Sequence, residues 1–313
     1  MYGTRTVLFL LLSIEPALAG LSSYSSQIVA DPPNSAIRTK SIRITYLGTN
    51  GYQFETGGHA LVVDPYFTRI SLARAGLGWS VRPNEVEIDK WLRHMDPRID
   101  GILVTHGHFD HLLDVPFVMQ RTHATLFASS IAIDLATRAG ASRNKCKAMQ
   151  PGMTRQIGPW RITALSASHD RVPLMGIPFN GAVKGDAAPI RARDWVCGQP
   201  LSYLIVANGK RIFVDSGGTP AVLPPTQVGP VDLAILGVAL PDSRSRFAAA
   251  VTRLRPRYVL PSHQDNFFLP LERGFQFATF SDFSFVRGEH ERQQLPGRLV
   301  LLDYFRPWTL PSR

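Results

Sequence analysis

Three histidines and an aspartate lie within the seven residues that end at His111. An apolar run, residues 101–104, comes directly before them. His106 and His108 can converge on one cation if the segment is extended, while Asp110 and His111 lie beyond a bend and can reach a second. Imidazole nitrogen and carboxylate oxygen suit zinc and the neighbouring first-row divalent metals. The alternative, a polar surface loop, rarely contains the whole H-x-H-x-D-H string.

Four other strand candidates end in a side chain that can bind a metal. They are residues 60–63, 160–167, 211–214 and 257–260, and they lead to Asp64, His169, Asp215 and His263. In α/β sheets, ligands bind outside the carboxyl ends of the strands. Five strand ends that each supply a metal-competent group therefore indicate one convergent site.

The remaining pattern alternates strands with helices. It predicts strands at residues 41–46, 52–55, 125–128, 202–207 and 233–236, and helices at 84–95, 131–139 and 247–253. Asn84 is a natural cap for the first of these helices, and Asp114 with Pro116 predicts another helix start. Asn208-Gly209 between two apolar runs is typical of a tight hairpin. The fold class predicted is α/β.

The ordered set of Asp64, His106-x-His108-x-Asp110-His111, His169, Asp215 and His263 resembles the signature of the metallo-β-lactamase superfamily. The similarity runs from about Ser41 to Phe305. The resemblance implies an αββα four-layer sandwich with a dinuclear site along one edge.

The same resemblance assigns each ligand position. It implies that one metal is held by His106, His108 and His169. It implies that the other is held by Asp110, His111 and His263. Asp215 would bridge the two metals, and Asp64 would support the ligands without binding a metal itself.

The last ligand favours one branch of the superfamily. Leu260-Pro-Ser-His263 resembles the Pro-x-His ending of the lactonase and phosphodiesterase branch, which includes ascorbate-6-phosphate lactonase and N-acyl-phosphatidylethanolamine phospholipase D. This chain departs from the Gly-Asp-Thr often found there, because it has Val214-Asp215-Ser216. No cysteine occupies a ligand position, which disfavours antibiotic hydrolysis.

Two divalent metals can share a water and generate hydroxide near neutral pH. We expect zinc, with manganese or iron as alternatives, and Asp110 could also orient the hydroxide. The expected enzyme is a metal-dependent hydrolase of a small molecule, a phosphodiester or other anionic ester. A lactone or carboxylic ester is the alternative within the fold. A non-catalytic protein that binds metal or polyanion is the alternative of another class, and the filled ligand positions disfavour it.

Substrate specificity must come from residues outside the metal ligands. The segment 170–201 is long for a strand connection, and such loops are often functional lids. Its candidate substrate-binding residues are Phe179, Arg191, Arg193 and Trp195, with the aromatic side chains holding an apolar group and the arginines an anion. A packed surface excursion is the alternative. Residues 66–83, which include Trp79, are a second candidate wall of the site.

The chain is long enough and apolar enough for a large core. It has 313 residues, of which 44% are hydrophobic and 19% charged, and its formal net charge is +10. Such a charge attracts anionic partners. However, the basic residues are scattered and not interleaved with aromatic residues, so we predict no specific nucleic-acid partner.

The N-terminal residues 1–19 have the order of a secretory signal, with cleavage after Ala19. We therefore expect an exported protein, periplasmic or secreted. No later apolar stretch is long enough to anchor the mature chain in a membrane. Residues 20–40 are expected to be a spacer, 41–306 the hydrolase domain and 307–313 a tail. After export, Cys146 and Cys197 could form a disulfide or remain buried thiols.

Overall fold

The computed structural model describes most of the chain after the expected signal segment, which itself lies outside the described residues. The described residues are 20–36, 40–172, 176–216, 228–240, 244–279, 281 and 283–312. Within this part of the chain, no helix is long and apolar enough to cross a membrane.

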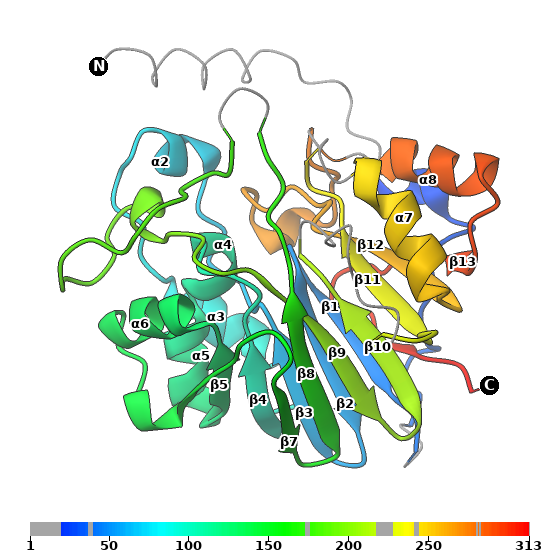
Figure 1. Ribbon diagram of the computed structural model, residues 1–313, viewed down its shortest axis with the longest axis horizontal. Helices are drawn as coiled ribbons and strands as arrows, with labels where there is room; N and C mark the ends of the chain where they lie inside the picture. The colour runs from blue at the N-terminus through cyan, green and yellow to red at the C-terminus, as the bar shows by residue number, and fades with distance from the viewer. Residues whose placement is uncertain are drawn as a thin grey trace.

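Two seven-stranded mixed sheets form the centre of the molecule (Figure 1). The first sheet has the order β14 (Trp308–Thr309), β1 (Arg43–Gly48), β2 (Gly51–Thr56), β3 (His59–Val63), β4 (Ile99–Leu103), β5 (Thr125–Ala128) and β6 (Cys146–Ala148). The second has the order β13 (Arg298–Leu299), β12 (Tyr258–Ser262), β11 (Leu233–Gly237), β10 (Lys210–Val214), β9 (Leu201–Ala207), β8 (Trp160–Ser166) and β7 (Thr154–Ile157).

Helices cover the outer faces of both sheets. The α-helices are α2 (Leu72–Gly76), α3 (Glu85–Leu92), α4 (Phe109–Leu112), α5 (Val115–Thr122), α6 (Ser130–Arg138), α7 (Arg244–Leu254) and α8 (Phe283–Arg292). Short 3-10 turns are η1 (Leu21–Tyr24), η2 (Arg143–Lys145), η3 (Ala192–Asp194) and η5 (Leu271–Arg273). Figure 1 shows α3, α5 and α6 on one side of the sandwich and α7 and α8 on the other. The predicted αββα sandwich is confirmed.

The side chains of β3 show how one strand serves two cores. Leu61 and Val63 belong to the core between the sheets, whereas Ala60 and Val62 belong to the core under the helices of the first sheet. Successive side chains of a strand point to opposite faces, so both faces of β3 are apolar. A strand buried on both faces reads as a continuous apolar run, which is why the sequence identified it.

Local signals were reliable at turns and helix starts, with one exception. The side chain of Asn84 accepts a hydrogen bond from the Glu87 N–H and caps α3 as expected. Asn208 and Gly209 both have positive φ, as a tight hairpin requires. Asp114 precedes α5, but its buried carboxylate caps no helix and accepts the Phe67 N–H at 2.6 Å instead. The Asp114 side chain thus bonds to a distant segment of the chain and not to its own helix.

The domain extends beyond the expected limits of 41–306 on both sides. Trp308–Thr309 forms a strand that pairs with β1, so this part of the expected tail completes the first sheet. Asp31, from the expected spacer, accepts hydrogen bonds from the backbone and the hydroxyl of Thr309. These long-range bonds fix both segments to the fold. Cys146 and Cys197 are both free thiols.

Candidate metal centre

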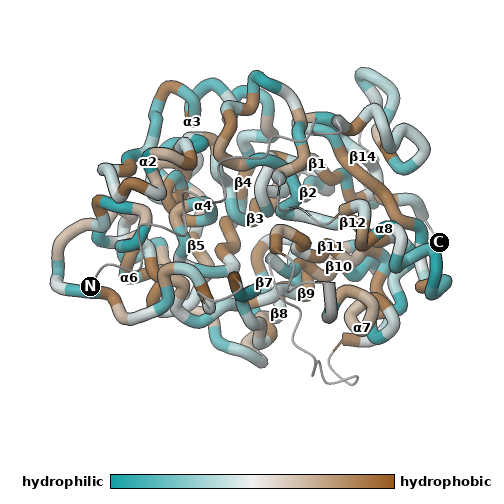
Figure 2. Tube along the Cα trace, turned by 90° about the horizontal axis from the view of Figure 1, so that it is seen from above, coloured by the Kyte–Doolittle hydropathy of each residue, from teal (hydrophilic) through white to brown (hydrophobic). Residues whose placement is uncertain are grey.

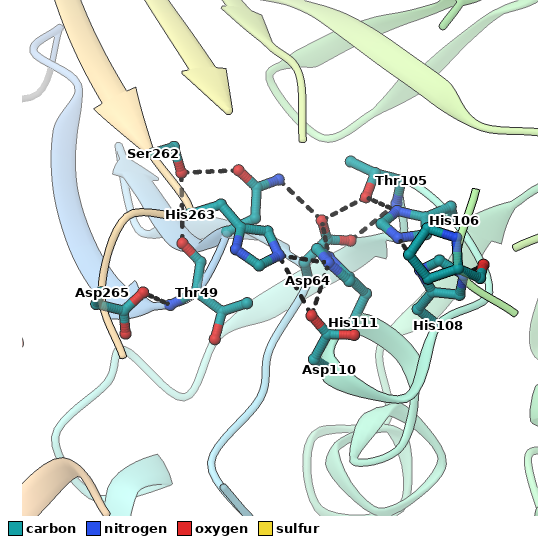
Figure 3. Close-up of polar contacts among 12 residues, drawn as sticks. Thr49, Asp64, Thr105, His106, His108, Asp110, His111, Ser262, His263 and Asp265 are labelled. Atoms are coloured by element: carbon teal, nitrogen blue, oxygen red, sulfur yellow. Dashed lines mark hydrogen bonds and ion pairs between the residues drawn. The ribbon is translucent and has the colours of Figure 1, made fainter. Parts of the chain in front are cut away.

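The predicted ligands lie at one edge of the sandwich, where five strands end. Asp64 follows β3, the three histidines of the motif follow β4, His169 follows β8, Asp215 follows β10 and His263 follows β12. Both sheets therefore contribute side chains to the same edge. Figure 3 shows the motif residues of the first sheet facing His263 of the second.

His106, His108 and His169 form the first group of candidate ligand atoms. One atom from each residue lies within 4.8 Å of the other two. His106 Nε2 and His108 Nδ1 are 2.9 Å apart, and the ring of His169 lies edge-on to both. Three imidazoles that meet in this way match the ligand number and type of a zinc site.

Asp110, His111 and His263 form the second group, and all three are buried. The Oδ2 atom of Asp110 lies 3.4 Å from His111 Nε2 and 3.2 Å from His263 Nε2. The two Nε2 atoms are themselves 3.2 Å apart. The ring centroids of His106 and His111 are 4.1 Å apart, so the two groups are adjacent.

In four of the candidate ligand histidines, the ring nitrogen that faces away from the other ligands contacts an oxygen. In two of them, that oxygen is a backbone carbonyl. His108 Nε2 lies 2.9 Å from the Pro178 carbonyl, and His169 Nδ1 lies 2.7 Å from the Asp170 carbonyl. A carbonyl only accepts, so these nitrogens carry the proton and leave the inward nitrogens free to bind a cation. Such outer contacts are what metal-binding histidines usually have. The donor atoms therefore fit two divalent metals.

Asp64 joins both groups. It is fully buried, and its Oδ2 accepts from His111 Nδ1 at 2.9 Å and from the Thr105 hydroxyl at 2.6 Å. The same hydroxyl lies 3.1 Å from His106 Nδ1 and can accept a hydrogen bond from it. Asn50 also donates to Asp64. In Figure 3, Asp64 lies between His111 and Thr105, where it can orient ligands without binding a metal.

The first group is neutral at physiological pH. Burial lowers the pKa of His108 to about 3 and the pKa of His169 to about 4. Burial also lowers the pKa of His106 well below its usual value. Because a histidine must be neutral to bind a cation, these three rings can bind one even at mildly acidic pH.

The second group carries charge. Burial alone would lower the pKa of His111, but Asp110 and Asp64 outweigh it and raise that pKa to about 10. Burial alone would raise the pKa of Asp110, but His111 and His263 outweigh it and hold that pKa well below its usual value. Asp110 is therefore ionised, and a divalent cation bound here would take the place of the His111 proton.

Gly107, between the first two ligands, is required by a neighbouring segment. Its N–H donates to the Cys197 carbonyl at 2.9 Å. A Cβ at this position would lie 2.2 Å from the Val196 carbonyl oxygen. The backbone of residues 196–197 thus passes directly over the motif, and any larger residue would push the two apart.

Sequence reasoning missed the buried network that fixes His263. The Asp265 carboxylate accepts hydrogen bonds from Arg69, Tyr46, Tyr304 and the Thr49 N–H. The Thr49 carbonyl in turn accepts the His263 N–H at 2.9 Å. The loop of His263 is thereby tied to the turn between β1 and β2. The only sequence signal is that Asp265 follows His263 by two residues.

A second missed residue, Arg246 of α7, contacts both neighbours of His169. Its Nη1 donates to the Ser168 hydroxyl, and its Nη2 lies 3.4 Å from the buried Asp170 carboxylate. Nothing in the sequence indicates which element Asp170 would face. Arg246 holds the end of β8 against α7.

The four predicted substrate-binding residues separate in the structure. The ring of Phe179 lies edge-on to His108 with centroids 5.9 Å apart. Trp195 is only 1% exposed and belongs to the core under the first sheet's helices, so it cannot contact substrate as predicted. Arg191 directly precedes η3, Arg193 lies within it, and both are exposed. No described contact brings either arginine to the ligands.

Asp215, the predicted bridge, is buried where β10 ends. Its backbone N–H donates to Ile235 and its carbonyl accepts from Gly237, so the chain is fixed at this position. Neither group of close ligand atoms includes its carboxylate. The bridging role stays a prediction.

A model of the Beta-lactamase superfamily domain matches residues 59–264, which contain every predicted ligand. The chain belongs to this superfamily. A relative named UPF0173 metal-dependent hydrolase, from Anaeromyxobacter dehalogenans, is 27% identical over 248 residues, covering 76% of this chain and 79% of the relative. Another of that name, from Bacillus velezensis, is 26% identical and covers 72% of this chain and 86% of the relative.

Solved structures show the same fold. Igni18, a metallo hydrolase from the archaeon Ignicoccus hospitalis, superposes with a TM-score of 0.58 at 17% identity, covering 87% of this chain and all of that chain. The metallo-β-lactamase fold protein YhfI from Bacillus subtilis has a TM-score of 0.54 at 16% identity, with 86% and 99% covered. The chain is thus placed among the metal-dependent hydrolases of the metallo-β-lactamase fold.

Proposed function

We propose that the protein is a dinuclear metal hydrolase that cleaves an ester bond at the edge of the sandwich. The observation that carries the proposal is the pair of adjacent ligand groups. His106, His108 and His169 would hold one divalent metal, most simply zinc, and Asp110, His111 and His263 the other. Manganese or iron would also accept these ligands.

Two bound divalent metals supply a nucleophilic hydroxide at neutral pH and polarise the bond to be cleaved. The residues around them prepare the site for this. Asp64 and the Pro178 and Asp170 carbonyls keep the proton on the outward nitrogens of the ligand histidines. Because its pKa is held so low, Asp110 acts as ligand and hydrogen-bond acceptor, orienting the nucleophile rather than storing its proton.

For the substrate, we propose a phosphodiester or another anionic ester. Two dications outweigh the carboxylates among the ligands, and the chain has a net charge of +10. Both features attract an anion. A lactone or carboxylic ester with an apolar arm is the second candidate, and the aromatic neighbours favour it. Phe179 lies edge-on to His108, and Phe267 lies edge-on to His263 with centroids 5.0 Å apart.

The test begins with protein purified without added metal. Elemental analysis should find two divalent metals per chain. Rates should then be compared on an aryl phosphodiester, a lactone with an apolar chain and a β-lactam. We expect the phosphodiester to give the highest kcat/KM. A faster lactone would replace our substrate proposal with the second candidate and leave the dinuclear site intact.

Variants test the ligands themselves. His108→Ala and Asp110→Ala should each lose metal and reduce turnover to background. His59→Ala is the matched control, since His59 pairs with Asp100 away from the ligand groups. The control should retain both metals and full activity. Undiminished turnover in either ligand variant would contradict the proposed chemistry.

We also propose that the protein is exported, from the order of residues 1–19 in the sequence. N-terminal sequencing of the protein from cell fractions is the test. We expect a chain that begins at Gly20 in the periplasmic or secreted fraction. An intact Met1 in the cytoplasmic fraction would contradict the proposal.

A further inference from the structure

Large apolar side chains are exposed on one small surface near the metal-ligand edge. Leu77 is 51% exposed, Trp79 55% and Ile190 54%. They are three of the five large hydrophobic residues that are exposed in the described part of the chain. An isolated bridge between Ser80 and Arg191 brings the two segments together. We call Leu77, Trp79 and Ile190 the apolar patch.

The backbone beneath the apolar patch is anchored. Val81 and Ala192, which adjoin the bridge, are buried in the core, and the Val81 N–H donates to the Ile190 carbonyl at 2.7 Å. The Trp79 N–H donates to the Arg74 carbonyl. The patch is therefore held outward by a fixed framework. Single exposed apolar side chains need no explanation, but a gathered set marks an interaction site.

Four exposed arginines adjoin the two segments that carry the apolar patch. Arg82 and Arg193 each lie two residues from the bridge, Arg191 is part of it, and the Arg74 guanidinium donates to the Ser80 carbonyl. The nearest acid in sequence, Asp194, accepts the N–H groups of Ile190 and Arg191. Exposed tryptophan and aliphatic side chains with basic residues close by are typical of surfaces that rest in the interface of an anionic membrane.

The apolar patch lies on the same edge of the sandwich as the ligands. Figure 1 shows α2 above α4 at this edge, and Figure 2 views the molecule from above, onto the same edge. The segment that carries Ile190 also carries Phe179, whose ring contacts His108. Farther along, its Cys197 carbonyl accepts the Gly107 N–H. A surface bound at the patch would lie beside the edge that carries the ligands.

We propose that the apolar patch and its arginines dock the enzyme onto the surface of an anionic lipid bilayer. The charge complementarity favours lipid headgroups, and Trp79 would sit at the level of these headgroups. Three apolar side chains are few for a stable protein interface, which buries about 800 Å² on each partner. Binding to a bilayer needs no such minimum area, because its strength is the sum of the apolar area inserted and the attraction of basic residues to anionic lipid. The proposal does not depend on the metal chemistry, since it involves no ligand.

Co-sedimentation of the full chain with vesicles is the test. Vesicles with about one-third phosphatidylglycerol should bind it at low salt, pure phosphatidylcholine vesicles should not, and high salt should weaken binding through charge screening. Arg82→Gln and Arg193→Gln should each weaken binding about fivefold, from the usual attraction of one arginine to such a surface. Trp79→Ser should weaken it further. Of the other four tryptophans, Trp160, Trp195 and Trp308 are buried, and Trp91 is half-buried and stacked on Phe305. A blue shift of tryptophan emission on binding should therefore be lost in Trp79→Phe.

Matched controls come from α8, on the far side of the sandwich (Figure 1). Phe285 is 37% exposed, and Arg287 lies on the same helix. Phe285→Ser and Arg287→Gln remove the same kinds of group and should bind vesicles like the wild type. Equal losses in patch and control variants would reduce the effect to net charge and overturn the proposal. So would absence of vesicle binding, or self-association that the patch variants abolish, which would assign the patch to a second copy of the chain.

Discussion

Replacing Asp64 with Asn is the sharpest test of how the metal centre is organised. The native carboxylate accepts four hydrogen bonds from three residues, Asn50, Thr105 and His111. Its Oδ1 accepts the Thr105 N–H and its Oδ2 the other three. An amide of the same shape has only one acceptor oxygen. In either orientation, its NH₂ group would face at least one donor.

The cost can be estimated from these contacts. A buried donor left without an acceptor costs about 1–3 kcal/mol, and the lost bond to His111 is charge-assisted. We expect the free energy of unfolding of the metal-free protein to fall by about 2–3 kcal/mol. The backbone adds no strain, because Asp64 has a φ of 41° and asparagine tolerates that region. Metal affinity should fall about 10- to 100-fold, as for other residues that orient ligands.

The assay is a chelator competition that resolves two binding steps, combined with urea unfolding. Metal binding by the second group should suffer more in Asp64→Asn, since His111 belongs to that group and Asp64 contacts it directly. Asp100→Asn is the matched control, because Asp100 pairs with His59 in the same way but outside the site. It should change neither step. Wild-type affinity at both steps in Asp64→Asn would refute the role assigned to this carboxylate.

Three further predictions follow from single contacts. Arg246→Gln should weaken metal binding by the first ligand group and shift the absorption spectrum of the cobalt(II)-loaded protein, while Arg287→Gln should leave both unchanged. An unaltered spectrum in Arg246→Gln would show that Arg246 does not position His169. Gly107→Ala should lower the free energy of unfolding by about 1–3 kcal/mol through overpacking, whereas Gly288→Ala, with open space at its Cβ, should be tolerated; equal thermal midpoints would contradict this. Burial raises the pKa of Asp114 to about 6, despite its hydrogen bonds. The folded state therefore binds this proton more tightly than the unfolded state, where the pKa is about 3.9. Its contribution to stability is complete below pH 4 and is lost as pH rises through 6. The urea midpoint of the wild type should therefore fall over this pH range, and Asp114→Asn should lack this part of the fall.

The strands and the grouping of the candidate ligands were predictable because each has a local signature. A strand buried on both faces, such as β3, is a short apolar run. Asp64, His106 and His263 each follow such a run, whereas His169 follows β8, which has exposed residues. Metal-competent residues at strand ends are few, so their convergence could be inferred without coordinates. The helix at 84–95 was found from its periodicity, although it ends at Leu92.

The supporting residues were not predictable, because their partners are distant in the chain. Asp265 contacts Arg69 across 196 residues, and Arg246 contacts Ser168 across 78. Neither contact has a periodic or spaced pattern. The prediction that Trp195 contacts substrate was wrong for a related reason. An aromatic residue in a long loop can face substrate or core, and the sequence does not show that residues 196–197 pack over Gly107 and leave Trp195 in the core.

These long-range contacts explain why the site needs the complete sandwich. Each ligand group takes residues from both sheets: His106 and His108 from the first with His169 from the second, then Asp110 and His111 with His263. The two sheets must therefore pack against each other in the native arrangement before either group of ligands can form. Arg246 and Asp265 act at the two points where a second-sheet ligand must be held against first-sheet partners. A metal bound at either group stabilises the folded state over the unfolded one, so metal affinity and sheet docking are linked.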